Sequence, residues 1–358
     1  MKDYIQELAN MGTTQVQAIT PKVIAAVIED IRRERRIWGQ FYKVNRDLIG
    51  SGGREVDFPK KRTGITASWD VSPEEGLSAA SMTFSAVTIP IKKGGVAIGF
   101  QGEAIRQAQR DVLADAIREA GEVWADTIDL VAFEALFPVA SAEALAAGAT
   151  LANSFVVGIR DMDTASQTIV QASTGKCTVT AANTISYWYV PLTGALSSAT
   201  DSVSVRRVTD NSGTFVAKDI LKGRADMLAK HHQPDVMVMH PTVLTDILYD
   251  SSVKFLEASA YGAKTPLWNA ELGKVWDMSV IVTTKMPRYG IALLDSGDIG
   301  YEIHRKPMKL TRDEYSGMSM DVLYFWGFQE INYGVVNPHA YGAIAFQGNL
   351  TELDAFTP

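Results

Sequence analysis

The sequence predicts an α+β fold, and three features carry this prediction: one long helix, one long two-stranded ribbon, and strands alternating with helices in the second half. The helix is expected over Gly99–Phe137, because small and apolar residues recur there at steps of three and four. Pro138 cannot continue a helix and sets its end. A rod on the order of 50 Å long indicates a scaffold and not a catalytic element.

The ribbon is expected between Arg54 and Phe100. Its outgoing strand covers Arg54–Thr66, and its returning strand covers Met82–Phe100, where apolar residues alternate with polar ones. A polar, turn-rich tip lies between the two strands. Because an isolated two-stranded ribbon is marginally stable, this one needs another surface, and we expect a neighbouring subunit to supply it.

The second half of the chain predicts a mixed α/β region with one β-rich insertion. Residues 165–216 are dense in Thr, Ser and Val and predict either an inserted all-β module of about 50 residues or an extended β excursion. A helix follows over Lys218–His231, then a buried strand over Val236–Met239 and a helix starting near Pro241. The chain closes with two or three strands rich in aromatic residues.

Composition excludes several classes of protein. The chain has 358 residues, 46% of them hydrophobic and 21% charged, which is typical of a folded domain. A net charge of −7 argues against a dedicated nucleic-acid binder, which would be basic. The single cysteine, Cys177, excludes an intrachain disulfide and is expected to be buried in a strand. No apolar run has the length of a signal peptide core or a membrane span, so we expect synthesis in the cytosol and no membrane contact.

No pattern in the sequence predicts chemistry. The five histidines form no metal-binding helix motif, and His240, which precedes Pro241, is expected to cap a helix or lie on the surface. The chain has no nucleophile elbow, no phosphate-binding loop and no dinucleotide fingerprint. We therefore predict no catalytic, cofactor-binding or metal-binding residues, and no enzyme.

The order of these elements resembles the major capsid proteins of tailed double-stranded DNA viruses, the Hong Kong 97-type family of phage coat proteins. Four stretches carry the resemblance: TIPIKKGGVAIGFQGEAIRQA, QPDVMVMHPTVLTDIL, GKVWDMSVIVTTKMP and VVNPHAYGAIAF. They look like the strand before the family's spine helix, two steps of its apical domain and its closing segment. The likeness covers nearly the whole chain except about residues 140–215.

The resemblance implies a Hong Kong 97-like α+β fold with four parts. These are an N-terminal arm at 1–52, an E-loop ribbon at 53–95, a peripheral (P) domain with the spine helix at 96–138 and 320–358, and an apical (A) domain at 139–319 that includes the β-rich insertion at about 150–215. It also implies pentamers and hexamers that close an icosahedral shell around viral double-stranded DNA without sequence-specific contacts. The protein would lie in the virion after synthesis in the host cytoplasm.

Further partners follow from the same resemblance. The chain leaves no room for a long leading segment before its arm, so we expect a separate scaffolding protein, together with a portal protein and possible decoration proteins. An encapsulin-type nanocompartment shell is the alternative within the fold. A ligand-binding protein or enzyme whose long helix is coincidental is the alternative outside it.

We expect subunit interfaces on the ribbon, at a basic helix end and in one segment of the apical domain, since Trp, Tyr and Arg dominate interface energetics. The predicted interface residues are Arg32, Arg33, Arg35, Arg36, Phe58, Trp69, Glu74, Glu75, Phe84, Tyr261 and Trp268. Some members of the family join an E-loop lysine to a P-domain asparagine with a glutamate as base. Candidates for that cross-link here are Lys60, Lys61, Asn332, Asn337 and Glu330.

Overall fold

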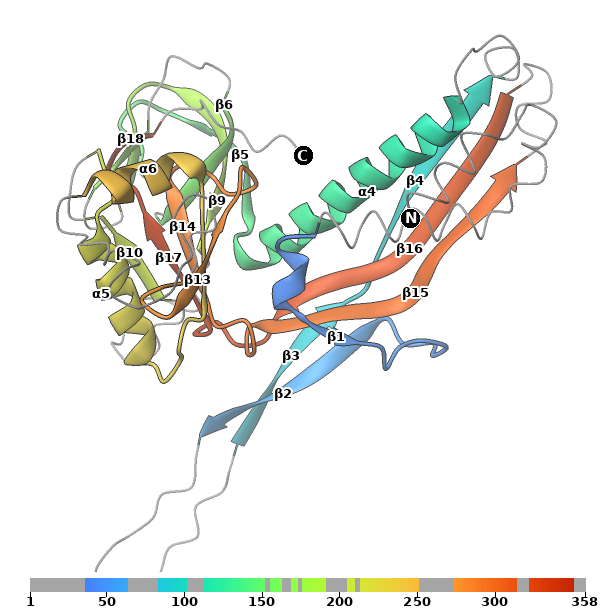
Figure 1. Cartoon of the computed structure of the whole chain (residues 1–358), viewed down its shortest axis with the longest axis horizontal. Helices are drawn as coiled ribbons and strands as arrows, with labels where there is room; N and C mark the ends of the chain where they lie inside the picture. Colours follow the sequence, from blue (N-terminus) through green and yellow to red (C-terminus); the bar gives the residue numbers. More distant parts are fainter. Residues whose placement is uncertain are drawn as a thin grey trace, which may run out of the picture. The chain divides into compact units, whose positions relative to one another are not determined.

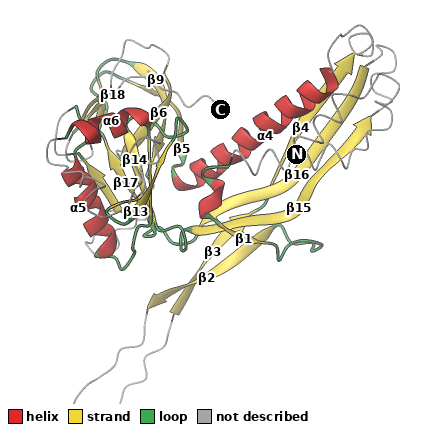
Figure 2. Ribbon diagram, in the orientation of Figure 1, coloured by secondary structure: helices red, strands yellow, loops and turns green. Residues whose placement is uncertain are grey.

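The computed structural model describes most of the chain as two compact units (Figures 1 and 2). The first unit holds residues within 44–124 and 301–336, and the second holds residues within 36–43, 125–300 and 337–350. The described residues are 36–63, 83–101, 112–151, 155–162, 169–172, 176–190, 205–209, 213–250, 274–313 and 322–350.

An elongated four-stranded sheet forms the centre of the first unit. Its order is β1 (Lys43–Asn45), β15 (Gly300–Asp313), β16 (Val322–Val335) and β4 (Lys92–Gln101). Strands β16 and β4 pair antiparallel from Val322 opposite Gln101 to Ile331 opposite Lys92. Because the side chains of a strand alternate between faces, β16 presents two different surfaces.

Helix α4 (Val112–Leu136) contributes residues 112–124 to this unit, where they cover one face of the sheet (Figure 1). The buried Trp124 donates its indole N–H to Oε1 of Gln329 on β16, at 3.1 Å. On β4, a Cβ added at Gly94 would lie 2.7 Å from the Trp124 ring, so glycine is what lets the helix approach this strand. The helix therefore rests on the face that carries Phe325, Gln329 and Ile331, all buried.

The predicted start of the long helix at Gly99 is wrong, because β4 continues to Gln101. Gly99 and Phe100 pair with Tyr324 and Leu323 on β16, and this tertiary pairing overrides the helical spacing of the sequence. The predicted end is confirmed, since α4 ends at Leu136, just before Pro138. Residues 102–111 lie outside the described part of the chain.

The ribbon is confirmed as an antiparallel pair, β2 (Glu55–Thr63) and β3 (Thr83–Pro90), although its returning strand is shorter than predicted. The strand expected over Met82–Phe100 is two strands, β3 and β4, which belong to different sheets. Each of these two strands has one covered and one open face, so apolar and polar residues alternate along both of them. The alternation therefore continues across residue 91, and it cannot reveal that one strand ends there and another begins.

The base of the ribbon packs against strands β15 and β16 of its own unit. Phe58 stacks on Tyr301 of β15, with ring centroids 4.3 Å apart and planes 7° apart. Ile89 is 3% exposed and lies against Gly334 of β16, where an added Cβ would meet it at 2.4 Å. The expectation that a neighbour must support the ribbon is therefore wrong for its base. The tip, residues 64–82, lies outside the described residues.

The second unit is built on a six-stranded mixed sheet. Its order is β10 (Val205–Val208), β17 (Tyr341–Ala345), β14 (Gly290–Leu294), β11 (Val236–Met239), β13 (Met278–Val282) and β12 (Lys274–Val275). Helices α5 (Ala217–Leu228) and α6 (Pro241–Tyr249) pack with this sheet around one core, which includes Ile220, Val243 and Leu293. His240 caps α6, as expected, by accepting the Thr242 amide at its Nδ1.

Two small sheets complete the second unit and replace the expected separate module. One orders β5 (Val139–Leu145), β9 (Asn183–Tyr189) and β6 (Val156–Met162); the other orders β18 (Gly348–Leu350), β7 (Ile169–Gln171) and β8 (Cys177–Val179). The first begins before the expected insertion, and the second takes a strand from residues 348–350. Strand β10 leaves the region for the six-stranded sheet. Local composition cannot reveal such long-range pairings.

The two compact units are not divided where the predicted domains are, and the predicted domain bounds stay a prediction. The long helix itself is divided, since residues 112–124 of α4 lie in the first unit and residues 125–136 in the second. Most of β15 belongs to the first unit, and strands β17 and β18 belong to the second. For these strands, hydrogen-bonded pairing decides the assignment.

A buried carboxylate fixes the start of the described chain to α4. One oxygen of Asp129 accepts the backbone N–H groups of Ile37, Trp38 and Gly39 at 3.0, 2.7 and 3.1 Å. These amides lead into the short 3-10 helix η2 (Gly39–Phe41), whose amide end favours a negative charge. Lys285 lies 3.2 Å from the other oxygen and neutralises it. The Trp38 side chain, 0% exposed, then packs against Phe133 of α4.

Candidate assembly interface

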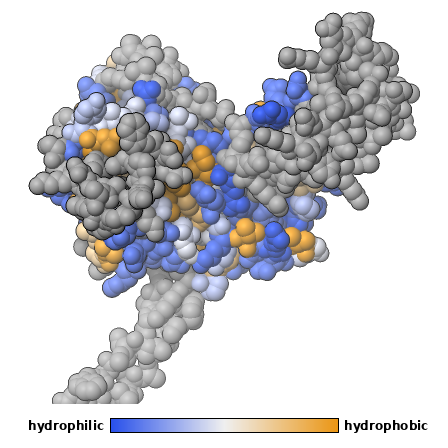
Figure 3. All heavy atoms as spheres, in the orientation of Figure 1, coloured by the Kyte–Doolittle hydropathy of each residue, from blue (hydrophilic) through white to orange (hydrophobic). Residues whose placement is uncertain are grey.

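The face of the elongated sheet opposite α4 carries a row of exposed aromatic side chains. Trp326 is 39% exposed and Phe328 is 43% exposed, while Tyr324 is half-buried with its ring 6.0 Å from that of Trp326. We call Tyr324, Trp326 and Phe328 the aromatic row. In the view of Figure 3, the described surface is mostly hydrophilic with separate apolar patches. Exposed aromatic rings grouped on one sheet face are typical of a surface that another molecule covers.

The opposing strand is shaped to hold these rings. Across the pair, Tyr324, Trp326 and Phe328 face Gly99, Ala97 and Gly95 of β4, the smallest residues available. An added Cβ would lie 3.0 Å from the Tyr324 ring at Gly99 and 2.8 Å from the Phe328 ring at Gly95. The two glycines therefore let these rings lean over β4, so the aromatic row forms a continuous apolar surface across two strands.

Cations surround one end of the aromatic row. The Lys93 ammonium lies 4.1 Å from the centre of the Phe328 ring, a cation–π contact. Glu330 pairs with Lys306 at 3.0 Å and with Arg305 at 3.1 Å. The hydrogen bond from Lys306, opposed by partial burial and supported by the charges of Lys306, Arg305 and Lys93, holds the pKa of Glu330 below its usual value. Three cations against one carboxylate leave this end positive.

The predicted interface residues are only partly within the described chain. Phe58 stacks on Tyr301, and a guanidinium N–H of Arg36 donates to the carbonyl of Gly39. Phe84 lies on β3 opposite Lys61, with a side chain outside the described set. The others lie outside the described residues: Arg32, Arg33, Arg35, Trp69, Glu74, Glu75, Tyr261 and Trp268. The described residues of the prediction form no common cluster, and their interface role stays a prediction.

The aromatic row was not predicted from the sequence. The segment YFWGF was expected to form a strand, and it does, within β16. Its alternation could not say which of the two faces would meet a helix. The signal that could have found the open face is the matching GGVAIG segment, whose small residues at 95, 97 and 99 recur at the same period of two.

Three of the five cross-link candidates are engaged in other contacts, while Lys60 and Lys61 lie on β2 with side chains outside the described set. Asn332 is 5% exposed, and its side chain donates to the carbonyl of Pro90 at 2.7 Å. Asn337 donates to Asp298 at 2.8 Å. Glu330, with a lowered pKa and two cationic partners, is a weak base for deprotonating a lysine. This geometry does not favour an amide cross-link at either asparagine.

The described residues contain no candidate metal site. No group of three or more His, Cys, Asp or Glu side chains gathers in a metal-binding arrangement within them. Cys177 is buried in β8, as expected, and burial raises the pKa of its thiol to about 12. Within the same residues, no helix combines the length and apolarity that crossing a bilayer requires.

These elements define a known fold. A long helix on an elongated sheet, a two-stranded ribbon and a mixed α/β unit together form the Hong Kong 97-like fold of phage capsids, with mixed α+β composition. The chain matches no protein-family profile, and no curated protein resembles it in sequence. The likeness therefore lies in structure.

Solved capsid structures share this fold over most of their length. The capsid of the cyanophage P-SCSP1u has a TM-score of 0.57 and 13% identity, over 87% of this chain and 88% of that one. The capsid of a native GTA particle has a TM-score of 0.55 and 14% identity, over 87% and 91%. The mature capsid of bacteriophage PhiM1 has a TM-score of 0.55 and 8% identity, over 87% of both chains.

Proposed function

We propose that this chain is a major capsid protein, which self-assembles as pentamers and hexamers into an icosahedral shell around viral double-stranded DNA. The observation that carries the proposal is the fold shared with viral capsids over nearly the full length of both chains. It acts through its interfaces and not as an enzyme. Its place is the virion, after synthesis in the host cytoplasm.

The aromatic row supports this proposal because it supplies one half of a contact between copies. The other half, in our proposal, is the ribbon tip of a neighbouring copy. Residues 64–82 contain Trp69, Asp70, Glu74 and Glu75 and no lysine or arginine. An acidic segment with one large aromatic side chain complements the positive end of the aromatic row. Such a contact joins two different surfaces, and repeated heterologous contacts close rings when the rotation between copies allows it.

Other partners belong to the same proposal. A separate scaffolding protein, a portal protein and decoration proteins would join the shell. Packaged DNA would be enclosed without sequence-specific contact, in keeping with the net charge of −7, since a sequence reader would be basic.

The test is electron microscopy of the purified recombinant chain, with light scattering on the same sample. The proposal predicts rings of five or six copies, tubes or closed shells of megadalton mass. A uniform monomer or dimer at high concentration, unchanged by crowding agents or a scaffolding protein, would contradict it. Particles from producing cells that enclose an enzyme and no DNA would favour the nanocompartment alternative.

A further inference from the structure

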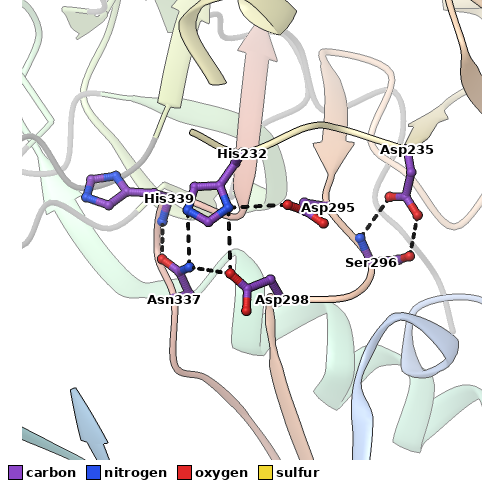
Figure 4. Close-up of polar contacts among 7 residues, drawn as sticks. All are labelled: His232, Asp235, Asp295, Ser296, Asp298, Asn337 and His339. Carbon is purple, nitrogen blue, oxygen red and sulfur yellow. Dashed lines mark hydrogen bonds and ion pairs between the residues drawn. The ribbon is translucent and has the colours of Figure 1, made fainter. Parts of the chain in front are cut away.

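A histidine lies at the centre of a polar cluster in the second unit (Figure 4). His232 follows α5, and its side chain is 14% exposed. Its Nδ1 lies 3.2 Å from a carboxylate oxygen of Asp295 and 3.7 Å from one of Asp298. Its Nε2 lies 3.2 Å from the side-chain nitrogen of Asn337. Both ring nitrogens therefore have a partner, from two different parts of the chain.

Two further bonds fix the orientation of the Asn337 side chain. Its nitrogen donates to Asp298 at 2.8 Å, and its oxygen accepts the backbone N–H of His339 at 3.2 Å. Rotating the amide by half a turn would oppose oxygen to the Asp298 carboxylate and NH₂ to an N–H group. The NH₂ group must consequently point at His232, so Nε2 accepts and carries no proton. The ring is then neutral, with its proton on Nδ1 donated to Asp295.

Protonation of the ring would break this pattern at one end only. A proton on Nε2 would point at the NH₂ group of Asn337, placing two donors against each other. The other end would keep its bond, because a charged ring is attracted more strongly to Asp295 and Asp298. Asn337 would have to turn away and give up its bonds to Asp298 and to the His339 amide.

The charged and titratable groups around His232 are consistent with a protonated ring that keeps its carboxylate partners and loses Asn337. The loop between β14 and β15 contributes Asp295 and Asp298, while the segment after β16 contributes His339. Asp235 is held by Ser296 of the same loop, and Lys230 and His231 on the ring's own segment are exposed. The carboxylates of Asp295 and Asp298 attract a positively charged ring, whereas the Asn337 amide and the burial of the ring, which is 14% exposed, oppose the charge.

Asn337 occupies a special position in the chain. The chain passes from the second unit to the first between residues 300 and 301, and it returns between residues 336 and 337. The Asn337 backbone N–H donates to the carbonyl of Ile299, at 3.1 Å, so the two crossing segments are joined there. A change at the Asn337 side chain therefore acts where the chain re-enters the second unit.

We propose that His232 is a protonation switch that, on acidification, releases the side chain of Asn337 and loosens the turn at residues 336–340. Histidine is the side chain whose charge ordinarily changes between pH 5 and 8. The inference rests on the hydrogen-bond pattern alone and does not depend on the proposed shell. In a shell it would supply an acid-sensitive point in each subunit.

The test is amide hydrogen exchange at pH 7.5 and pH 5.5, corrected for the intrinsic pH dependence of exchange. In the natural chain, the protection of the His339 amide should fall about five- to tenfold at the lower pH, as expected for losing one hydrogen bond. In His232→Gln, which keeps a neutral donor and acceptor, protection should stay constant. The matched control is His231→Asn, which removes the adjacent exposed histidine and suits that residue's left-handed φ of 66°; it should keep the response.

Two outcomes would overturn the switch. One is protection of His339 that does not change with pH, and the other is an equal fall in His232→Gln. If that variant does not fold, nitrogen NMR of the histidines in the natural chain decides the question. A proton on Nδ1 of His232 at pH 7.5 supports the proposal, and a proton on Nε2 overturns it. Particle formation is not part of either readout, so failure here leaves the capsid proposal standing.

Discussion

The central sheets of the two units differ in how much of each face is buried within the chain. In the six-stranded sheet, every residue of β11, β14 and β17 is buried, so both faces of its inner strands are covered within the chain. In the elongated sheet, β16 buries Phe325 and Gln329 and leaves Trp326 and Phe328 39% and 43% exposed. The inner strands of the second unit are thus covered on both faces, whereas the first unit presents an apolar face that its described residues do not cover.

The difference teaches how one chain can be both a stable fold and a building block. Strands that are covered on both faces within one chain give stability that does not depend on other copies. An open apolar face in the same chain gains its burial only on association, so folding and assembly are assigned to different surfaces. Substitutions in the two places should consequently have opposite signatures.

The largest effect on stability is expected at Asp129, the buried carboxylate of the second unit. Asp129→Ala removes the acceptor of three backbone amides and leaves Lys285 without one of its two carboxylate partners. We expect a loss of about 3–5 kcal/mol in the free energy of unfolding, as for breaking a buried ion pair. Urea denaturation followed by circular dichroism measures it. The control is Asp115→Ala, at an exposed site on the same helix, and equal losses in the two variants would refute this account.

A smaller loss is expected on the covered face of the elongated sheet. Gly94→Ala places a methyl group 2.7 Å from the Trp124 ring, which is tighter than packed atoms tolerate. The helix or the strand must shift, at a cost of about 1–3 kcal/mol. Thermal unfolding measures the change. Gly52→Ala is the matched control because an added Cβ meets nothing there within 4 Å, and it should leave the melting temperature nearly unchanged. A Gly94→Ala variant as stable as that control would show that α4 does not press on β4.

The largest effect on association is expected on the open face. Replacing Trp326 and Phe328 together by serine removes rings that are 39% and 43% exposed, so it loses the packing of their covered parts, at a cost of about 1–2 kcal/mol in the free energy of unfolding. Assembly measured by light scattering should fall by at least about tenfold in yield, as expected for losing aromatic anchors. The control is Tyr249→Ser, since Tyr249 is 86% exposed on α6 of the second unit. Particles that form as well as those of the natural chain would exclude the aromatic row from the interface.

The sequence predicted those elements whose signals are local. The strand Val236–Met239 is confirmed at the predicted residues, and the helix end before Pro138 and the cap at His240 follow from side chains next to them. The errors lie where distant segments pair. Gly99 belongs to a strand because β16 lies beside it, and β18 joins β7 across 176 or more residues of chain, from Gln171 to Gly348.

The candidate site was harder to predict than the fold for a related reason. A side chain's place on an open or covered face depends on which element packs against the strand, and α4 is separated from β16 by more than 180 residues of chain. Trp326 and Phe325 are neighbours of similar chemistry, yet one is 39% exposed and the other 3%. Only the position of the helix distinguishes them.

The measurement that tests the central claim most directly is an electron-microscopy reconstruction of particles formed by the purified chain. The account predicts shells in which density from a neighbouring copy covers Trp326 and Phe328. Shells in which this face of the elongated sheet is bare to solvent would contradict the assigned interface, and a chain that forms no particles at all would contradict the proposed function.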